Sequence, residues 1–208
     1  MKKSILSFVS VIIVLFLWGC YPDGPDYIEE MDVVLTYHSD TYDFVSKATY
    51  AMPDKIVKIT GNLLEGEDPE TIPDIYAEKI LSQIEENMQA YGWERVDDVT
   101  DTANIDMLLF PAAWETTTIY YYYDYWSWWY GGYYPYWGYP PYYYYGGSYS
   151  TGTLLMSLVD PKEVATNGNP VVQWSGAVNG ILTDTYDATR MNTAIDKAFS
   201  QSPYLKTN

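Results

Sequence analysis

Apolar residues recur in two kinds of pattern along the chain, and one of them is typical of β-strands. Short runs rich in Val, Ile and other apolar residues, many bounded by Pro, Gly, Asn or Asp, predict strands at 32–37, 49–51, 56–60, 105–110, 153–159 and 171–178. In the run 105–110, Ile105, Met107 and Leu109 lie on one face and Leu108 and Phe110 on the other, which indicates a strand buried on both faces. Turn residues at 160–162 and 167–170 predict that the last two strands form an antiparallel hairpin.

The second pattern consists of apolar residues spaced by three and four, and it predicts two amphipathic helices. The apolar face of the first comprises Ala77, Ile80, Leu81, Ile84, Met88 and Tyr91. Pro73 suits its first turn and Gly92 suits its C-terminal end. The apolar face of the second comprises Met191, Ile195, Ala198, Phe199 and Ser202. Asp184 or Thr185 is the expected N-cap of this second helix.

The order of these elements predicts an α+β fold. We expect a mainly antiparallel sheet with the two amphipathic helices packed on one face, all within a single domain at residues 32–208. A long Tyr/Trp/Gly/Pro-rich loop interrupts this domain at residues 119–149.

The first residues of the chain have the order of features that an export signal needs. Lys2 and Lys3 precede an apolar run from Ile5 to Trp18, which is shorter than the roughly 20 residues of a membrane-spanning helix. Residues 17–20 (LWGC) resemble the lipobox of bacterial lipoproteins, although that motif usually has a small or aliphatic residue in place of Trp18. We therefore expect a cleaved lipoprotein signal peptide at 1–19, a lipid on Cys20 and a flexible tether at 20–31. The alternative is an ordinary signal peptide with a chance cysteine.

Cys20 is the only cysteine of the chain, which narrows the chemistry of the mature domain. Once Cys20 carries lipid, no thiol remains for a disulfide, a cysteine nucleophile or a Cys-type zinc site. The formal net charge of −17 becomes −19 when Lys2 and Lys3 are removed with the signal peptide. A domain with this charge is repelled by nucleic acid, so we do not expect nucleic acid as a partner. Acidic lipid head groups repel it as well, so we expect its membrane attachment to depend on the lipid.

The segment 119–149 is built almost entirely from Tyr, Trp, Gly and Pro. Its rings can pack on one another and on the sheet, or the segment can be a disordered loop. Otherwise they can contact another protein, stack on sugar rings or lie at a lipid interface. The residues expected to make a partner or glycan contact are Tyr125, Trp126, Trp128, Trp129, Tyr134, Trp137 and Tyr142.

Candidate catalytic chemistry is sparse. His38 is the only histidine, so no His-based metal cluster can form, and we expect it at the surface or hydrogen-bonded. No phosphate-binding or dinucleotide-binding glycine motif occurs. Carboxylates gather at Asp97, Asp98, Asp101 and Asp106, where a solvated acidic turn is favoured over a paired-carboxylate hydrolase. We therefore expect no catalytic residues, no metal, no cofactor and no enzymatic activity.

Several short segments together resemble a known family. They are residues 42–51 (YDFVSKATYA), 152–154 (GTL), 158–160 (LVD), 172–176 (VQWSG) and the closing helix at 195–199. In order and spacing they resemble domain of unknown function 4136, a family of bacterial lipoproteins. Met52 departs from the family, which often has Trp at that position. The resemblance implies an α+β fold and a periplasmic or outer-membrane setting, and it implies no activity.

These observations predict a non-enzymatic lipoprotein, anchored by lipid to the outer membrane of a bacterial envelope on its periplasmic or surface face. The leading hypothesis is a structural or protein-interaction module whose aromatic loop contacts another envelope protein. The alternative is a module that binds peptidoglycan or polysaccharide through the same loop.

Overall fold

A computed structural model describes residues 33–60, 67–100, 103–114, 129, 152–164, 170–180, 182 and 187–207. The predicted signal peptide, Cys20 and the tether lie outside the described residues. The same is true of the aromatic segment 119–149, with the exception of Trp129.

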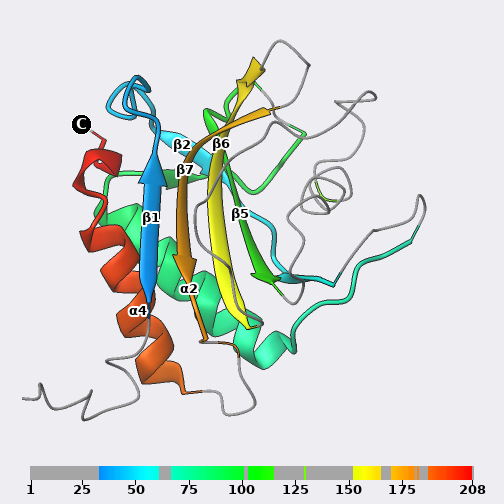
Figure 1. Ribbon diagram of the computed structural model, residues 1–208. Coiled ribbons are helices and arrows are strands. Elements are labelled where there is room, and N and C mark those ends of the chain that lie inside the picture. The colour runs from blue at the N-terminus through cyan, green and yellow to red at the C-terminus, as the bar shows by residue number, and fades with distance from the viewer. Residues whose placement is uncertain are drawn as a thin grey trace, which may run out of the picture. The chain divides into compact units, whose positions relative to one another are not determined.

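The described residues form a seven-stranded sheet with the order β1-β7-β6-β5-β2-β4, in which β3 also pairs with β5 (Figure 1). The strands are β1 (Val34–His38), β2 (Thr49–Ala51), β3 (Val57–Ile59), β4 (Glu94–Arg95), β5 (Met107–Trp114), β6 (Thr153–Val164) and β7 (Pro170–Val178). All the predicted strands are present, and β6 and β7 form the predicted antiparallel pair.

The expectation of a mainly antiparallel sheet is wrong, because the sheet is mixed. β1, β7, β6 and β5 pair in antiparallel fashion. By contrast, β2 and β3 run parallel to β5, and β4 runs parallel to β2. Parallel neighbours need a crossover connection, and the helix between β3 and β4 provides one. Apolar spacing within a strand carries no information on the direction of its neighbours, so the sequence pattern could not predict this arrangement.

The two main helices are α2 (Asp74–Ala90) and α4 (Ala188–Ser200), and they pack against the same face of the sheet (Figure 1). The buried side chains of α2 include Ala77, Ile80 and Ile84, as its spacing predicts. The expected N-cap of α4 at Asp184 or Thr185 is wrong. Asp187 caps this helix, and its carboxylate accepts hydrogen bonds from the backbone N–H groups of Thr189 and Arg190.

The core between the helices and the sheet contains a polar link. Trp174 on β7 is fully buried, and its ring centroid lies 5.5 Å from that of Phe199 on α4. Its indole N–H donates to the hydroxyl of Ser202, at 2.8 Å. Ser202 precedes the short helix η3 (Pro203–Leu205). One side chain of β7 therefore fixes both α4 and the turn that follows it.

The opposite face of the sheet is also buried around β5, although not along β1. Every residue of β5 is buried, in agreement with the predicted strand, but β5 continues through Pro111 to Trp114. Pro111 lies between the part of β5 that pairs with β2 and the part that pairs with β3. This position tolerates a residue without an N–H group. On this second face Trp129 stacks on Phe110, with ring centroids 5.7 Å apart.

Replacement of Trp129 by Ala should lower the free energy of unfolding by roughly 1–2 kcal/mol, since a half-buried indole loses its contact with Phe110. Urea denaturation at neutral pH measures the loss. Trp129→Phe keeps an aromatic ring and should lose less than half as much. Equal stability of Trp129→Ala and the unmodified protein would contradict a packing role for this ring.

Candidate functional site

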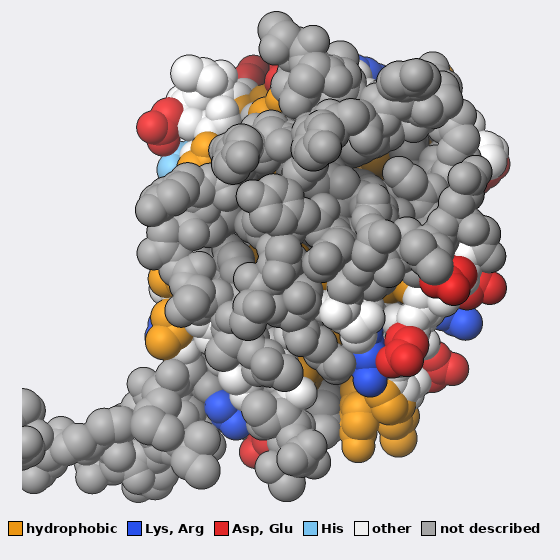
Figure 2. All heavy atoms as spheres, turned by 45° about the vertical axis from the view of Figure 1, so that its right-hand side comes forward, with side chains coloured by type: hydrophobic (Ala, Val, Ile, Leu, Met, Phe, Trp, Pro, Cys, Tyr) orange, Lys and Arg blue, Asp and Glu red, His pale blue; other side chains and the backbone are white. Residues whose placement is uncertain are grey.

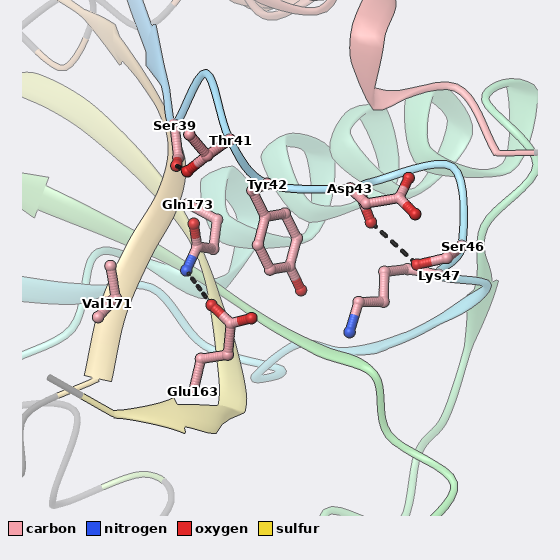
Figure 3. Close-up of a pocket in the computed structure, with 9 residues that line it drawn as sticks. All are labelled: Ser39, Thr41, Tyr42, Asp43, Ser46, Lys47, Glu163, Val171 and Gln173. Atoms are coloured by element: carbon pink, nitrogen blue, oxygen red, sulfur yellow. Dashed lines mark hydrogen bonds between the residues drawn. The ribbon is translucent and has the colours of Figure 1, made fainter.

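A polar pocket of about 400 Å³ lies where the β1–β2 loop meets β6 and β7 (Figure 3). Its lining comprises Ser39, Thr41, Tyr42, Asp43, Ser46, Lys47, Glu163, Val171 and Gln173. Tyr42 lies between Asp43, Ser46 and Lys47 on one side and Glu163 and Gln173 on the other (Figure 3). The pocket therefore joins residues that are far apart in the sequence.

The β1–β2 loop is held in place by packing and by backbone hydrogen bonds. Phe44 is buried at its centre, and the ring of Tyr42 meets that of Phe44 edge-on at 4.8 Å. The N–H of Ser39 donates to the carbonyl of Gln173 at 2.8 Å, and the N–H of Lys47 donates to the carbonyl of Phe44 at 3.1 Å. These contacts give the loop a defined conformation without regular secondary structure.

An irregularity in β6 shapes the other wall. Val159 pairs with Val172, whereas Val164 pairs with Pro170, so β6 has more residues than β7 between these two pairs. Residues 160–163 of β6 lie opposite the single residue Val171 of β7, and turn chemistry predicts the end of the strand there. They form instead a bulged continuation of β6. A bulge changes the direction in which the side chains of a strand point. Asp160 and Glu163 belong to this bulge.

Asp160 connects the two walls and is only 1% exposed. Its Oδ2 atom accepts hydrogen bonds from Lys47 Nζ at 2.8 Å and from the hydroxyl of Tyr42 at 2.6 Å. Its Oδ1 atom accepts one from the backbone N–H of Lys162 at 2.7 Å. The carboxylate is thus paired with a cation and also hydrogen-bonded, as a buried charge requires.

These contacts determine the protonation states beside the pocket. Burial raises the pKa of Asp160, but the donors of Lys47, Tyr42 and Lys162 and the charge of Lys47 outweigh burial and hold it below its ordinary value. Burial, the hydrogen bond to Asp160 and its negative charge all raise the pKa of Tyr42. At neutral pH Asp160 is therefore an anion, and Tyr42 is a protonated donor.

The described carboxylates of the predicted acidic cluster each have a separate local partner. Asp97 lies 3.4 Å from Arg95, and Asp98 accepts hydrogen bonds from the backbone and hydroxyl of Thr100. Asp106 accepts from the N–H groups of Ala48 and Thr49 at the start of β2. Asp101 lies outside the described residues. Within the described ranges no three His, Cys, Asp or Glu side chains are placed to share a metal ion.

Of the remaining residues singled out from the sequence, the structure describes His38 and Trp129. His38 is partly exposed, stacks on Tyr204 at 3.7 Å and lies 3.4 Å from Asp40, in agreement with a surface residue. Of the predicted contact residues only Trp129 is described, and its ring packs on the sheet. The other predicted contact residues are Tyr125, Trp126, Trp128, Tyr134, Trp137 and Tyr142, and they lie outside the described residues, as does Cys20.

No single sequence motif indicates the pocket, but several of its residues come from segments that carry the family resemblance. Three of the segments that carry the family resemblance contribute to this region: residues 42–51 supply Tyr42 and Lys47, 158–160 supply Asp160, and 172–176 supply Gln173. Their convergence became visible only in the folded chain.

Comparison with known proteins agrees with the fold. The family model described as "Domain of unknown function (DUF4136)" matches residues 33–204. The crystal structure of a DUF4136 family protein from Bacteroides thetaiotaomicron is 27% identical, covers 84% of this chain and 97% of its own, and superposes with a TM-score of 0.60.

Two PelC dodecamer structures from Paraburkholderia phytofirmans are more distant. One is 14% identical, covers 86% of this chain and 100% of its own, and has a TM-score of 0.42. The other is 15% identical, covers 81% and 96%, and has a TM-score of 0.40. No relative among the curated proteins matches this chain.

Asp160→Asn should lower the free energy of unfolding at pH 7 by about 2–4 kcal/mol, because Lys47 loses its buried partner. The folded-state pKa of Asp160 is lowered, so its charge stabilises the protein above the ordinary carboxyl pKa of about 3.9. That contribution is lost as the pH falls through the lowered value.

Denaturation curves from pH 7 down to pH 2 measure this difference, which should shrink at the acidic end. Asp40→Asn is the matched control, since Asp40 is an exposed carboxylate in the same loop and should change stability by less than about 0.5 kcal/mol. A pH-independent difference for Asp160→Asn would contradict the assigned ionic role.

Proposed function

Since the chain belongs to the family described as domain of unknown function (DUF4136), we propose that it is a non-enzymatic lipoprotein of the bacterial envelope that acts as a protein-interaction module. The family name assigns no activity, so the proposal depends on features of this chain. Two features support it, namely the N-terminal lipoprotein motif and the exposed edge of the sheet.

The anchor is proposed from the first residues. Lys2, Lys3, the apolar run and Cys20 have the order of a lipoprotein signal, and the lipid would hold the domain at the outer membrane, on its periplasmic or surface face. A single acyl chain holds a protein only marginally, whereas two or more hold it firmly. In the described part of the chain, no helix has the length and apolar character needed to cross a bilayer.

The edge strand β1 is the observation that carries the interaction proposal. Val34 faces the helix-side core, so the side chains of Val33, Leu35 and Tyr37 point to the other face. They are 48%, 41% and 40% exposed, respectively. This row of exposed apolar side chains lies along a strand that has a described partner, β7, on one edge only.

The backbone of β1 offers hydrogen-bonding groups to a partner. The carbonyl of Val33 accepts a hydrogen bond from the N–H of Asn179, and the N–H of Ser39 donates one to the carbonyl of Gln173. The backbone N–H and C=O groups of the odd-numbered residues are therefore directed toward β7. Because this direction alternates along a strand, the N–H and C=O groups of Val34, Thr36 and His38 are directed away from β7.

The two edges of the sheet differ in their protection. Proteins usually protect an exposed edge with charged residues, proline or a very short strand. The opposite edge strand, β4, has only two residues, Glu94 and Arg95, and Arg95 is paired with Glu85 at 3.0 Å. Residues 33–37 contain no charge and no proline. This contrast supports an extended segment of another envelope protein as the partner, added to the sheet beside β1.

The charge of the chain supports the choice of partner. At a formal net charge of −17, nucleic acid is repelled. Figure 2 shows described acidic side chains at the margins of the molecule, several of them beside Lys or Arg side chains. Binding of peptidoglycan or polysaccharide by the aromatic segment stays a prediction, and Trp129, its described member, already packs on Phe110.

Cys20→Ala should abolish lipid attachment and move the protein from the membrane fraction to the soluble fraction. Metabolic labelling with a palmitate analogue, followed by membrane fractionation, measures both effects. Ser7→Ala within the apolar run is the control and should leave labelling intact. Equal labelling of Cys20→Ala and the unmodified protein would exclude the proposed anchor.

A photo-crosslinking amino acid at position 35 should give one discrete protein adduct in living cells, and the same group at position 75 should give none. Ile75 is the matched control because it is an exposed apolar residue on α2, away from β1. Val33→Lys with Tyr37→Lys should reduce the adduct by roughly tenfold, since charges are costly in an apolar contact. Adducts of equal yield from both positions, or none from position 35, would contradict an interaction through β1.

A further inference from the structure

We propose that the pocket beside Asp160 binds a neutral, hydroxyl-rich ligand of the saccharide class. The residues that line this pocket belong neither to the exposed row Val33, Leu35 and Tyr37 of β1 nor to the aromatic segment 119–149. The inference therefore goes beyond the proposed interaction function and does not depend on it.

The charges of the pocket exclude anions. Lys47 is the only cation among the lining residues, and its ammonium group is already paired with the buried carboxylate of Asp160 at 2.8 Å. Two further carboxylates, Asp43 and Glu163, line the pocket and would repel a phosphate or a carboxylate. This repulsion leaves neutral and cationic ligands, and the hydrogen-bonding groups of the pocket are the reason to propose a neutral one.

The hydrogen-bonding groups of the pocket match hydroxyl groups. Gln173 is only 2% exposed, and its amide N–H donates to Glu163 Oε2 at 3.1 Å (Figure 3). A carboxylate accepts through two oxygens, and an amide has two N–H groups and a carbonyl oxygen, so this pair has capacity beyond its one mutual bond. A sugar hydroxyl both donates and accepts, which allows adjacent hydroxyls to engage the amide and the carboxylate together.

The remaining lining residues add apolar contact and further hydroxyls. The ring of Tyr42 and the side chain of Val171 offer apolar surface to the C–H groups of a sugar ring. Ser39 and Thr41 place their hydroxyls 3.3 Å apart on the same loop. The volume of about 400 Å³ lies in the range of roughly 300–1,000 Å³ that is usual for small-molecule sites.

The buried ionic link preorganises the pocket. Asp160 holds both Lys47 and Tyr42, so the loop does not have to be ordered when a ligand arrives. Ordering of side chains and loops is a main cost of binding, and a site that is already ordered avoids it. This gives the ion pair a positioning role for the site in addition to its role in stability.

Isothermal titration calorimetry of the full chain, in a detergent without a sugar headgroup, tests the proposal. The neutral probes are triacetylchitotriose, which represents N-acetylated wall glycan, and maltotriose, which represents a plain glucan. Glucosamine and glucuronate are the cationic and anionic comparisons. At least one neutral trisaccharide should bind, and more tightly than either charged sugar.

Glu163→Ala should weaken that binding by about tenfold or more, because it removes a charged acceptor. Glu163 is exposed, so this variant should fold normally. Glu163→Gln keeps an acceptor oxygen and should recover most of the affinity. Glu94→Ala removes an exposed carboxylate outside the pocket, and it should leave binding unchanged.

Failure of both neutral probes to bind, tighter binding of a charged sugar, or equal binding by Glu163→Ala would overturn the proposal. Val33→Lys with Tyr37→Lys should leave saccharide binding unchanged. A failure of this inference is therefore distinguishable from a failure of the proposed protein interaction at β1.

Discussion

Burial of β5 on both faces is the constraint on which the rest of the structure depends. This strand joins the antiparallel part of the sheet, through β6, to the parallel part, through β2 and β3. Alternate side chains of β5 enter two different cores, so Leu109 packs toward the helices and Phe110 toward the opposite side. Each fully buried apolar side chain contributes about 1.5–3 kcal/mol, and a shift of register by one residue would exchange the two sets.

The pocket is a consequence of where the regular ladder ends. Up to Val159, β6 pairs regularly with β5. Beyond it the bulge at 160–163 brings a carboxylate into a buried position, and a buried carboxylate needs donors. The β1–β2 loop supplies them through Lys47 and Tyr42. The bulge in β6, the conformation of the β1–β2 loop and the pocket therefore depend on one another. Loss of Lys47 would leave the buried carboxylate of Asp160 without its cation, and loss of Asp160 would leave Lys47 without its anion.

Family membership and function remain separate questions for this chain. The DUF4136 match establishes the fold, and folds host unrelated functions. The two proposals therefore depend on local features, namely a strand, β1, without charge or proline at residues 33–37 and a polar pocket beside the ion pair of Lys47 and Asp160. Both involve the end of β1, because His38 is its last residue and the pocket-lining loop begins at Ser39. Their proposed partners differ in chemistry, one apolar and extended, the other neutral and hydroxyl-rich.

The sequence by itself determined the two helices, their buried faces, every strand except β4 and the α+β class, because three-, four- and two-residue periodicities are properties of a local segment. It also predicts the lipid on Cys20 from a local motif. Only the tertiary structure decided the directions of β2 and β3, the packing of Trp129 on Phe110 and the pocket at Asp160. Tyr42 and Asp160 are 118 positions apart in the sequence. No local pattern relates them, since their contact depends on how the whole sheet assembles.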